Sequence, residues 1–186
     1  MRSAPLIALA GVELLRQAKK EGLPVTADVS INSLHLSDVD IGYFNPAMRL
    51  APPLRQQRDR DALRAALADG SIDALVSDHN PVTADEKNLP FAEATPGATG
   101  LELLLSLTLR WGADQGLSLA QSLQAITARP VQVLGSALGS LAASAGRLVE
   151  GGVGDVCVFD PAASGAVTPE RLVSQGKHTP FAFDIT

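Results

Sequence analysis

The chain has 186 residues, of which 46% are hydrophobic and 19% are charged. This composition supports a packed core and excludes wholesale disorder. Lys and Arg number 15 against 20 Asp and Glu, a net charge of −5, so no basic excess points to nucleic acid or to an anionic membrane surface. No apolar run reaches the roughly 18 residues of a membrane span, and we expect no transmembrane helix.

Cysteine and serine chemistry is limited in this sequence. Cys157 is the only cysteine, which excludes a disulfide framework and a zinc site built from cysteines. Cys157 lies in an apolar segment and no Gly-x-Ser-x-Gly motif occurs, so there is no signature of nucleophilic catalysis. A lone cysteine fits a reducing compartment, and we expect a cytoplasmic protein.

The first half of the chain alternates helical and strand-like patterns. Apolar residues recur at helical spacing up to Lys19 and Lys20, and Gly22 ends this helix. Residues 24–29 alternate like a strand, and 72–77 hold a continuous apolar run typical of a strand buried on both faces. In order, we predict a helix at 6–20, a strand at 24–29, a long connection at 30–57, a helix at 58–68 and a strand at 72–77.

The second half begins with a polar loop at 78–96 and continues with helical patterns. After Gly146 the composition changes, and two strand-like pieces, 147–150 and 155–159, flank a turn at Gly151-Gly152. The helices of this half are predicted at 99–111, 119–127 and 131–138.

The order of these elements predicts the fold class. Strands that alternate with helices are typical of parallel βα units, so we expect an α/β fold. Two strands cannot form a stable open sheet alone, and we expect that something is missing on the N-terminal side. We divide the chain into a βα part at 1–145 and a C-terminal β segment with its tail at 146–186.

The sharpest candidate site is Asp78-His79-Asn80-Pro81, directly after the buried strand. A carboxylate at the carboxyl end of a parallel strand can bind a divalent metal and accept a proton from a metal-bound water. The same residues are typical of a helix cap or an Asx-turn at the start of a loop, which is the commoner outcome of such a pattern.

A metal site built from this chain alone finds little support. A hydrolytic zinc site needs three or more ligands and an open position, but the histidines are only His35, His79 and His178, and no His-x-His or His-Glu-x-x-His motif occurs. His35 lies in an apolar alternation that suits a structural or a functional role, and His178 lies in the tail, where exposure is expected. Residues 97–100 could hold an anion before a helix, but we favour a plain helix start capped by Thr99.

Several segments, taken together and in order, resemble the C-terminal part of dihydroorotases, within the amidohydrolase superfamily. They cover nearly the whole chain. The segments are GVELLRQAKKEGLPVTADVS at 11–30, PPLR at 52–55, DGSIDALVSDHNP at 69–81, EK at 86–87, GATGLEL at 97–103, GRLVEGGVGDVCVFDP at 146–161 and SQGKHTPF at 174–181.

The resemblance implies a metal-dependent (β/α)8 barrel, with zinc as the family's metal, that interconverts carbamoyl-aspartate and dihydroorotate in pyrimidine synthesis. A complete barrel needs roughly 200–250 residues, so the chain would hold the last two βα units and a segment of a small β domain at 146–161. The family's other metal ligands would lie upstream, so the chain looks like a fragment. Asp78 is the one family ligand that remains, and by resemblance it would also be the general base.

Other family positions depart from the pattern. The family's Asp-His-Ala-Pro-His ends here in Val82, which cannot donate a hydrogen bond to a substrate carboxylate. Ala51 replaces a substrate-binding asparagine, and residues 30–34 replace the family's Thr-Pro-His-His-Leu. Pro96 and Gly97 occupy the substrate loop that often reads Pro-Phe-Gly, and by resemblance they are the substrate-binding candidates. Losing two polar contacts should cost several kcal/mol, at about 1–3 for each.

Two functions stay open. One is a non-catalytic, dihydroorotase-like scaffold, similar to chains that accompany aspartate carbamoyltransferase as structural subunits. The other is the C-terminal piece of a working dihydroorotase or a related cyclic amidase. For this chain alone we expect no turnover of dihydroorotate. A partial barrel would expose parts of 24–29 and 72–77, so we expect self-association or dependence on a partner.

Overall fold

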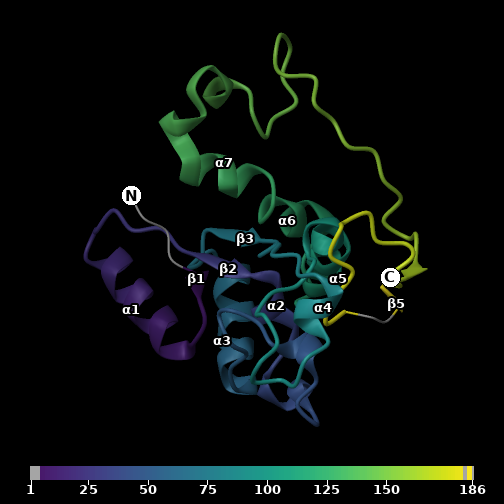
Figure 1. The fold of residues 1–186 in the computed structure, drawn as a ribbon. Coiled ribbons are helices and arrows are strands. Elements are labelled where there is room, and N and C mark those ends of the chain that lie inside the picture. The colour runs from purple at the N-terminus through teal and green to yellow at the C-terminus, as the bar shows by residue number, and fades with distance from the viewer. Residues whose placement is uncertain (1–4, 182–183, 186) are drawn as a thin grey trace.

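The computed structural model describes residues 5–181 and 184–185 (Figure 1). Its centre is a parallel sheet of β1 (Pro5–Leu6), β2 (Asp28–Ser30) and β3 (Ala74–Val76), in that order. Val29 pairs with Leu6 on one side and with Leu75 on the other. Val29 is fully buried, as expected for the central strand of a parallel sheet.

Helices connect and surround these strands, which gives the alternating βα order that the sequence predicts. The α-helices are α1 (Leu9–Lys20), α2 (Ile31–His35), α3 (Gln57–Ala68), α4 (Ala84–Lys87), α5 (Leu104–Asp114), α6 (Leu119–Gln124) and α7 (Ala128–Leu134). The 3-10 helices are η1 (Asp38–Ile41), η2 (Pro46–Met48), η3 (Leu101–Leu103) and η4 (Gly135–Ala143). Across the described ranges, no helix combines the length and the apolar character needed to cross a membrane.

The core is mainly aliphatic, and Trp111 and Phe181 are its buried aromatic residues among those the structure describes. Helix α1 packs against α3, and α2 contacts both α3 and α5. Val12, Leu67 and Leu107 bring one side chain from each of the three longer helices into the core, and Trp111 of α5 is fully buried. Helix α2 also contacts β2, and helix α7 contacts β3, so the packed helices help to place the loops that follow these strands.

The N-terminal helix is shorter than predicted, because Pro5–Leu6 forms strand β1. Leu6 fits the helical spacing, but its backbone pairs in register with Val29 of β2. Ala8 then adopts an extended conformation before α1 begins at Leu9. Tertiary pairing therefore overrides the local pattern, and the sheet has three strands where two were predicted.

The strands predicted at 147–150 and 155–159 do not form in the described structure. Leu148 is 86% exposed and Val158 is 94% exposed, so no partner strand covers these apolar residues. A strand needs such a partner, and the antiparallel pair forms later, between β4 (Gly165–Ala166) and β5 (Asp184–Ile185).

The tail returns to the βα part of the molecule (Figure 1). Leu172 and Phe181 are buried in the same apolar core as α1, α3 and α5. The backbone amide of Thr99 donates to the carbonyl of His178 over 2.8 Å. The tail therefore packs beside the start of the α5 region, next to the loop that follows β3.

Candidate functional site

Asp78 lies two residues beyond the end of β3, beside the end of β2. The hydroxyl of Ser30, the last residue of β2, donates to Asp78 Oδ2 over 2.8 Å. Ser30 is buried, and its hydroxyl also accepts the amide of Asn32, which caps α2. The neighbouring strand therefore orients the carboxylate, and this hydrogen bond is neither the helix cap nor the Asx-turn considered from the sequence.

The backbone of Asp78 is in the left-handed region, with φ +49°. Asp and Asn visit this region more readily than most residues because their short polar side chains bond locally. This conformation turns the chain sharply at the strand end and brings His79 and Asn80 under the loop at 97–101.

His79 is engaged by the backbone at the start of the α5 region. The amides of Gly100 and Leu101 both donate to His79 Nδ1, each over 3.2 Å. Nδ1 therefore acts as an acceptor, and the neutral ring carries its proton on Nε2. These amides are the donors that could have bound an anion at the helix start. Because they donate to His79 instead, the anion site considered for 97–100 is already occupied by the His79 side chain.

Thr99 does not cap the helix, contrary to the prediction. Its hydroxyl donates to the carbonyl of Gly176 over 2.5 Å, and the N-cap residue is Gly100, without a side-chain cap. The physical reason is that the tail packs beside Thr99 and places the carbonyl of Gly176 within hydrogen-bond distance, a contact that local sequence does not predict.

The loop at 95–98 lies against the segment after Asp78. Asn80 donates from its backbone amide to Ala98 O over 2.9 Å, and from Nδ2 to Pro96 O over 3.2 Å. Gly97 has φ +143°, and a Cβ there would lie 2.5 Å from Asn80 O and 2.9 Å from Val82 Cγ2. Asn80 and Val82 thus approach Gly97 so closely that a larger residue does not fit there. Val82 itself is buried and packs against this loop.

A buried lysine that the sequence analysis did not single out organises the same loop. Lys87 is 1% exposed, and its Nζ donates to the carbonyls of Arg49, Thr95 and Gly97 over 2.9, 3.1 and 2.8 Å. Burial, and then the charge of Arg49, lower the pKa of Lys87 to about 8. Its only sequence signal is its place in the EK pair quoted for the family.

Arg49 and Ala51 lie on the other side of this loop. The amide of Gly97 donates to Arg49 O over 3.1 Å, and the exposed Ala51 follows two residues later. The structure therefore brings Val82 and Gly97 together, places Ala51 near them only through its chain neighbour Arg49, and fixes Asp78 separately through Ser30.

The remaining histidines have structural roles. His35 Nε2 lies 2.9 Å from Leu107 O and its ring packs edge-on against Phe181. Burial, and then the charge of Arg64, lower the pKa of His35 to about 4. His178 is half-buried, not fully exposed as expected, and its carbonyl holds Thr99.

The side chains around Asp78 do not match the donor set of the zinc site that the resemblance implies. Among residues 5–181 and 184–185, no group of three or more His, Cys, Asp or Glu side chains is placed to hold a metal ion. Asp78 has a serine hydroxyl beside it, and His79 Nδ1 is used by backbone amides. The described residues of this chain therefore do not fit a metal centre by themselves.

Comparison with known proteins places this geometry in a family, although no family model matches the chain. A dihydroorotase-like protein of Pseudomonas aeruginosa is 39% identical over 176 residues, which are 95% of this chain and 40% of that protein. A dihydroorotase of Anaeromyxobacter dehalogenans is 39% identical over 172 residues, 91% of this chain and 38% of that protein. The chain belongs to the dihydroorotase family. It spans about two fifths of the length of these relatives.

Solved structures agree with the amidohydrolase (β/α)8 barrel as the fold of which this dihydroorotase-family chain is part. An L-hydantoinase from Arthrobacter aurescens superposes with a TM-score of 0.86 at 28% identity, over 98% of this chain and 40% of that chain. A dihydroorotase from Saccharomyces cerevisiae, solved with 5-fluoroorotic acid, has a TM-score of 0.61 at 16% identity over 68% of this chain, and supports the fold alone. The predicted fold class and family are therefore confirmed.

Proposed function

We propose that this chain is a dihydroorotase-like protein that does not by itself hydrolyse dihydroorotate to N-carbamoyl-aspartate. The observation that carries the proposal is the Ser30–Asp78 hydrogen bond of 2.8 Å. A serine hydroxyl stands beside the one carboxylate retained from the family's metal ligands, where hydrolysis would call for further imidazole or carboxylate ligands. Zinc, when bound in the family, would polarise the substrate and activate water; here Asp78 is the single residue offered to it.

The loop layer supports the same proposal. Val82 is buried against Gly97 and offers no hydrogen bond to a substrate carboxylate. Ala51 likewise carries no polar group. Each missing partner is worth about 1–3 kcal/mol of substrate binding, so a cyclic ureide acid would be held weakly even if a metal were supplied.

One observation favours a second candidate, the C-terminal piece of an active dihydroorotase or a related cyclic amidase. Asp78 keeps its place at the tip of the third parallel strand, the end of a (β/α)8 barrel at which active sites lie. In that case Asp78 would accept a proton from the attacking water, with the remaining ligands supplied from outside this chain. The substrate-binding candidates would then be Pro96 and Gly97, of which Gly97 directs its amide to Arg49 O and its carbonyl to Lys87.

We also propose partners for this chain. A scaffold role implies association with aspartate carbamoyltransferase or with further copies of this chain. Leu148, Val156 and Val158 are apolar and mostly exposed, which supports self-association because an apolar surface patch is usually covered by a partner. A compact monomer in sedimentation velocity would argue against self-association.

The proposal is tested by an assay of dihydroorotate hydrolysis on the purified 186-residue protein, with and without added zinc, beside its Asp78→Ala variant. We expect no turnover above background in any sample. Turnover that disappears in Asp78→Ala would overturn the non-catalytic proposal and favour the second candidate.

A further inference from the structure

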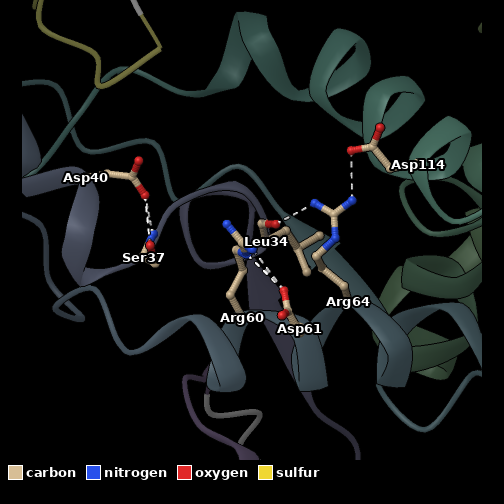
Figure 2. Close-up of polar contacts among 7 residues, drawn as sticks. All are labelled: Leu34, Ser37, Asp40, Arg60, Asp61, Arg64 and Asp114. Atoms are coloured by element: carbon tan, nitrogen blue, oxygen red, sulfur yellow. Dashed lines mark hydrogen bonds and ion pairs between the residues drawn. The ribbon is translucent and has the colours of Figure 1, made fainter.

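A cavity of about 490 Å³ lies between α2, η1, α3 and α5, and shares no lining residue with the layer around Asp78. Three arginines, Arg60, Arg64 and Arg110, line it together with two aspartates, Asp40 and Asp114. Such a concentration of guanidinium groups is unexpected in a chain with a net charge of −5. Figure 2 shows Arg60 and Arg64 rising from α3, with Asp114 facing them from α5 and Asp40 on the opposite side.

Arg64 forms a fixed wall of this cavity. One of its terminal nitrogens donates to Leu34 O over 2.9 Å and the other to Asp114 Oδ2 over 2.8 Å. Its side chain is only 13% exposed. The guanidinium is therefore held in one position without needing a ligand, and its charge acts on whatever enters the cavity.

Arg60 stands one helical turn before Arg64 on the same face of α3. Its Nε and one terminal nitrogen both donate to a single oxygen of Asp61, over 3.1 and 3.0 Å. The Asp61 side chain is 56% exposed, so this pair is a weak surface pair that water screens. An anion in the cavity can compete for Arg60, and Arg110 of α5 adds a third guanidinium to the lining.

The acidic residues of the lining already have donors. Asp40 Oδ2 accepts from the amide of Ser37 over 2.7 Å and from its hydroxyl over 3.0 Å, and Asp114 accepts from Arg64. His35 is neutral at physiological pH because its pKa lies at about 4, lowered by burial and by Arg64, Arg110 adding to the effect and Asp114 opposing it. The lining therefore carries three guanidinium groups against two carboxylates, a net charge of +1, and the imidazole beside them is neutral.

We propose that this cavity binds a small oxyanion, a phosphate or a carboxylate group, between Arg60 and Arg110 and in the field of Arg64. Guanidinium forks bind these planar or tetrahedral oxyanions through paired, charge-assisted hydrogen bonds. The proposal is independent of catalysis at Asp78, because none of these residues takes part in that layer.

The test is a titration of the full 186-residue protein with inorganic phosphate, and separately with succinate, at constant ionic strength set by chloride. Binding is followed by calorimetry and by amide chemical shifts. The variants are Arg60→Gln and Arg110→Gln, and Arg58→Gln is the matched control, since Arg58 is exposed on the same helix and does not line the cavity. All three remove one positive charge, and circular dichroism verifies that each variant folds.

We expect saturable binding of phosphate, succinate or both, with shifts centred on α2, α3 and the end of α5. Arg60→Gln and Arg110→Gln should each weaken the dissociation constant about tenfold, the loss expected for one charge-assisted contact, and Arg58→Gln should leave it within about twofold. Tighter binding of phosphate would identify the ligand as a phosphate group, and tighter binding of succinate would identify it as a carboxylate. Non-saturating shifts with both anions, or equal weakening in all three variants, would overturn the proposal.

Discussion

Ser30 donates a hydrogen bond of 2.8 Å from Oγ to Asp78 Oδ2 across the ends of two parallel strands. Ser30 is the last residue of β2, and Asp78 lies just beyond β3. The pair fixes the side chain that the resemblance assigns to metal and proton chemistry. Because the donor is a hydroxyl and not an imidazole, the contact orients the carboxylate without contributing a metal ligand of the kind that zinc prefers.

Replacing Ser30 should be costlier than replacing Asp78 by its amide. Ser30→Ala removes the donor to Asp78 and the N-cap of α2, so the free energy of unfolding should fall by about 1–2 kcal/mol. Asp78→Asn keeps an acceptor for Ser30 and a residue that tolerates φ +49°. This variant should change the free energy of unfolding by less than about 0.5 kcal/mol. Urea unfolding measures both; equal effects would mean that the pair does not hold the strand ends.

Lys87 should make the stability of the protein depend on alkaline pH. Its folded pKa of about 8 lies below the ordinary 10.5, so between these values the unfolded chain binds more protons and the free energy of unfolding rises with pH. Lys87→Met should remove this rise and, because three carbonyls lose their donor, should cost about 2 kcal/mol at neutral pH.

The matched control for Lys87 is Lys20→Met, since Lys20 is exposed on α1. Denaturant unfolding of the three proteins from pH 7 to pH 10.5 is the measurement, read as the difference between each variant and the parent. If Lys20→Met and Lys87→Met show the same pH dependence, Lys87 is not a buried cation that clamps the loop.

Gly97 should tolerate no side chain. A Cβ at Gly97 would lie 2.5 Å from Asn80 O, so Gly97→Ala must displace the loop and should cost about 2 kcal/mol or more. Gly116 has φ +67° but open space around it, and Gly116→Ala should cost only about 1 kcal/mol through its backbone conformation. Thermal unfolding compares the two; a cost at Gly97 no larger than at Gly116 would show that the loop is not closely packed.

The sequence predicted the elements whose signals are local and missed those that depend on distant partners. The helix predicted at 58–68 is α3, and the strand predicted at 72–77 contains β3. Strand β1 has two residues, too few to show a period of two. The connection predicted at 30–57 contains α2, a helix that packs on α3 and α5 and buries Ile31 and Leu34.

The candidate site was predicted in the same uneven way. Asp78 could be found because it follows a buried apolar run, whereas its contact with Ser30 spans 48 positions and leaves no local pattern. Lys87 reads as an ordinary charged residue, since its acceptors at Arg49 and Gly97 are brought to it by the fold. The apolar pieces at 147–159 show the opposite error, a strand-like pattern that has no partner in the described structure.

Zinc stoichiometry of the purified 186-residue protein, measured by equilibrium dialysis beside Asp78→Ala, tests the central claim most directly. The claim is that one carboxylate paired with a serine does not assemble a metal centre within this chain. We predict no stoichiometric zinc and no difference between the two proteins. One or two tightly bound zinc ions per chain, lost in Asp78→Ala, would contradict it.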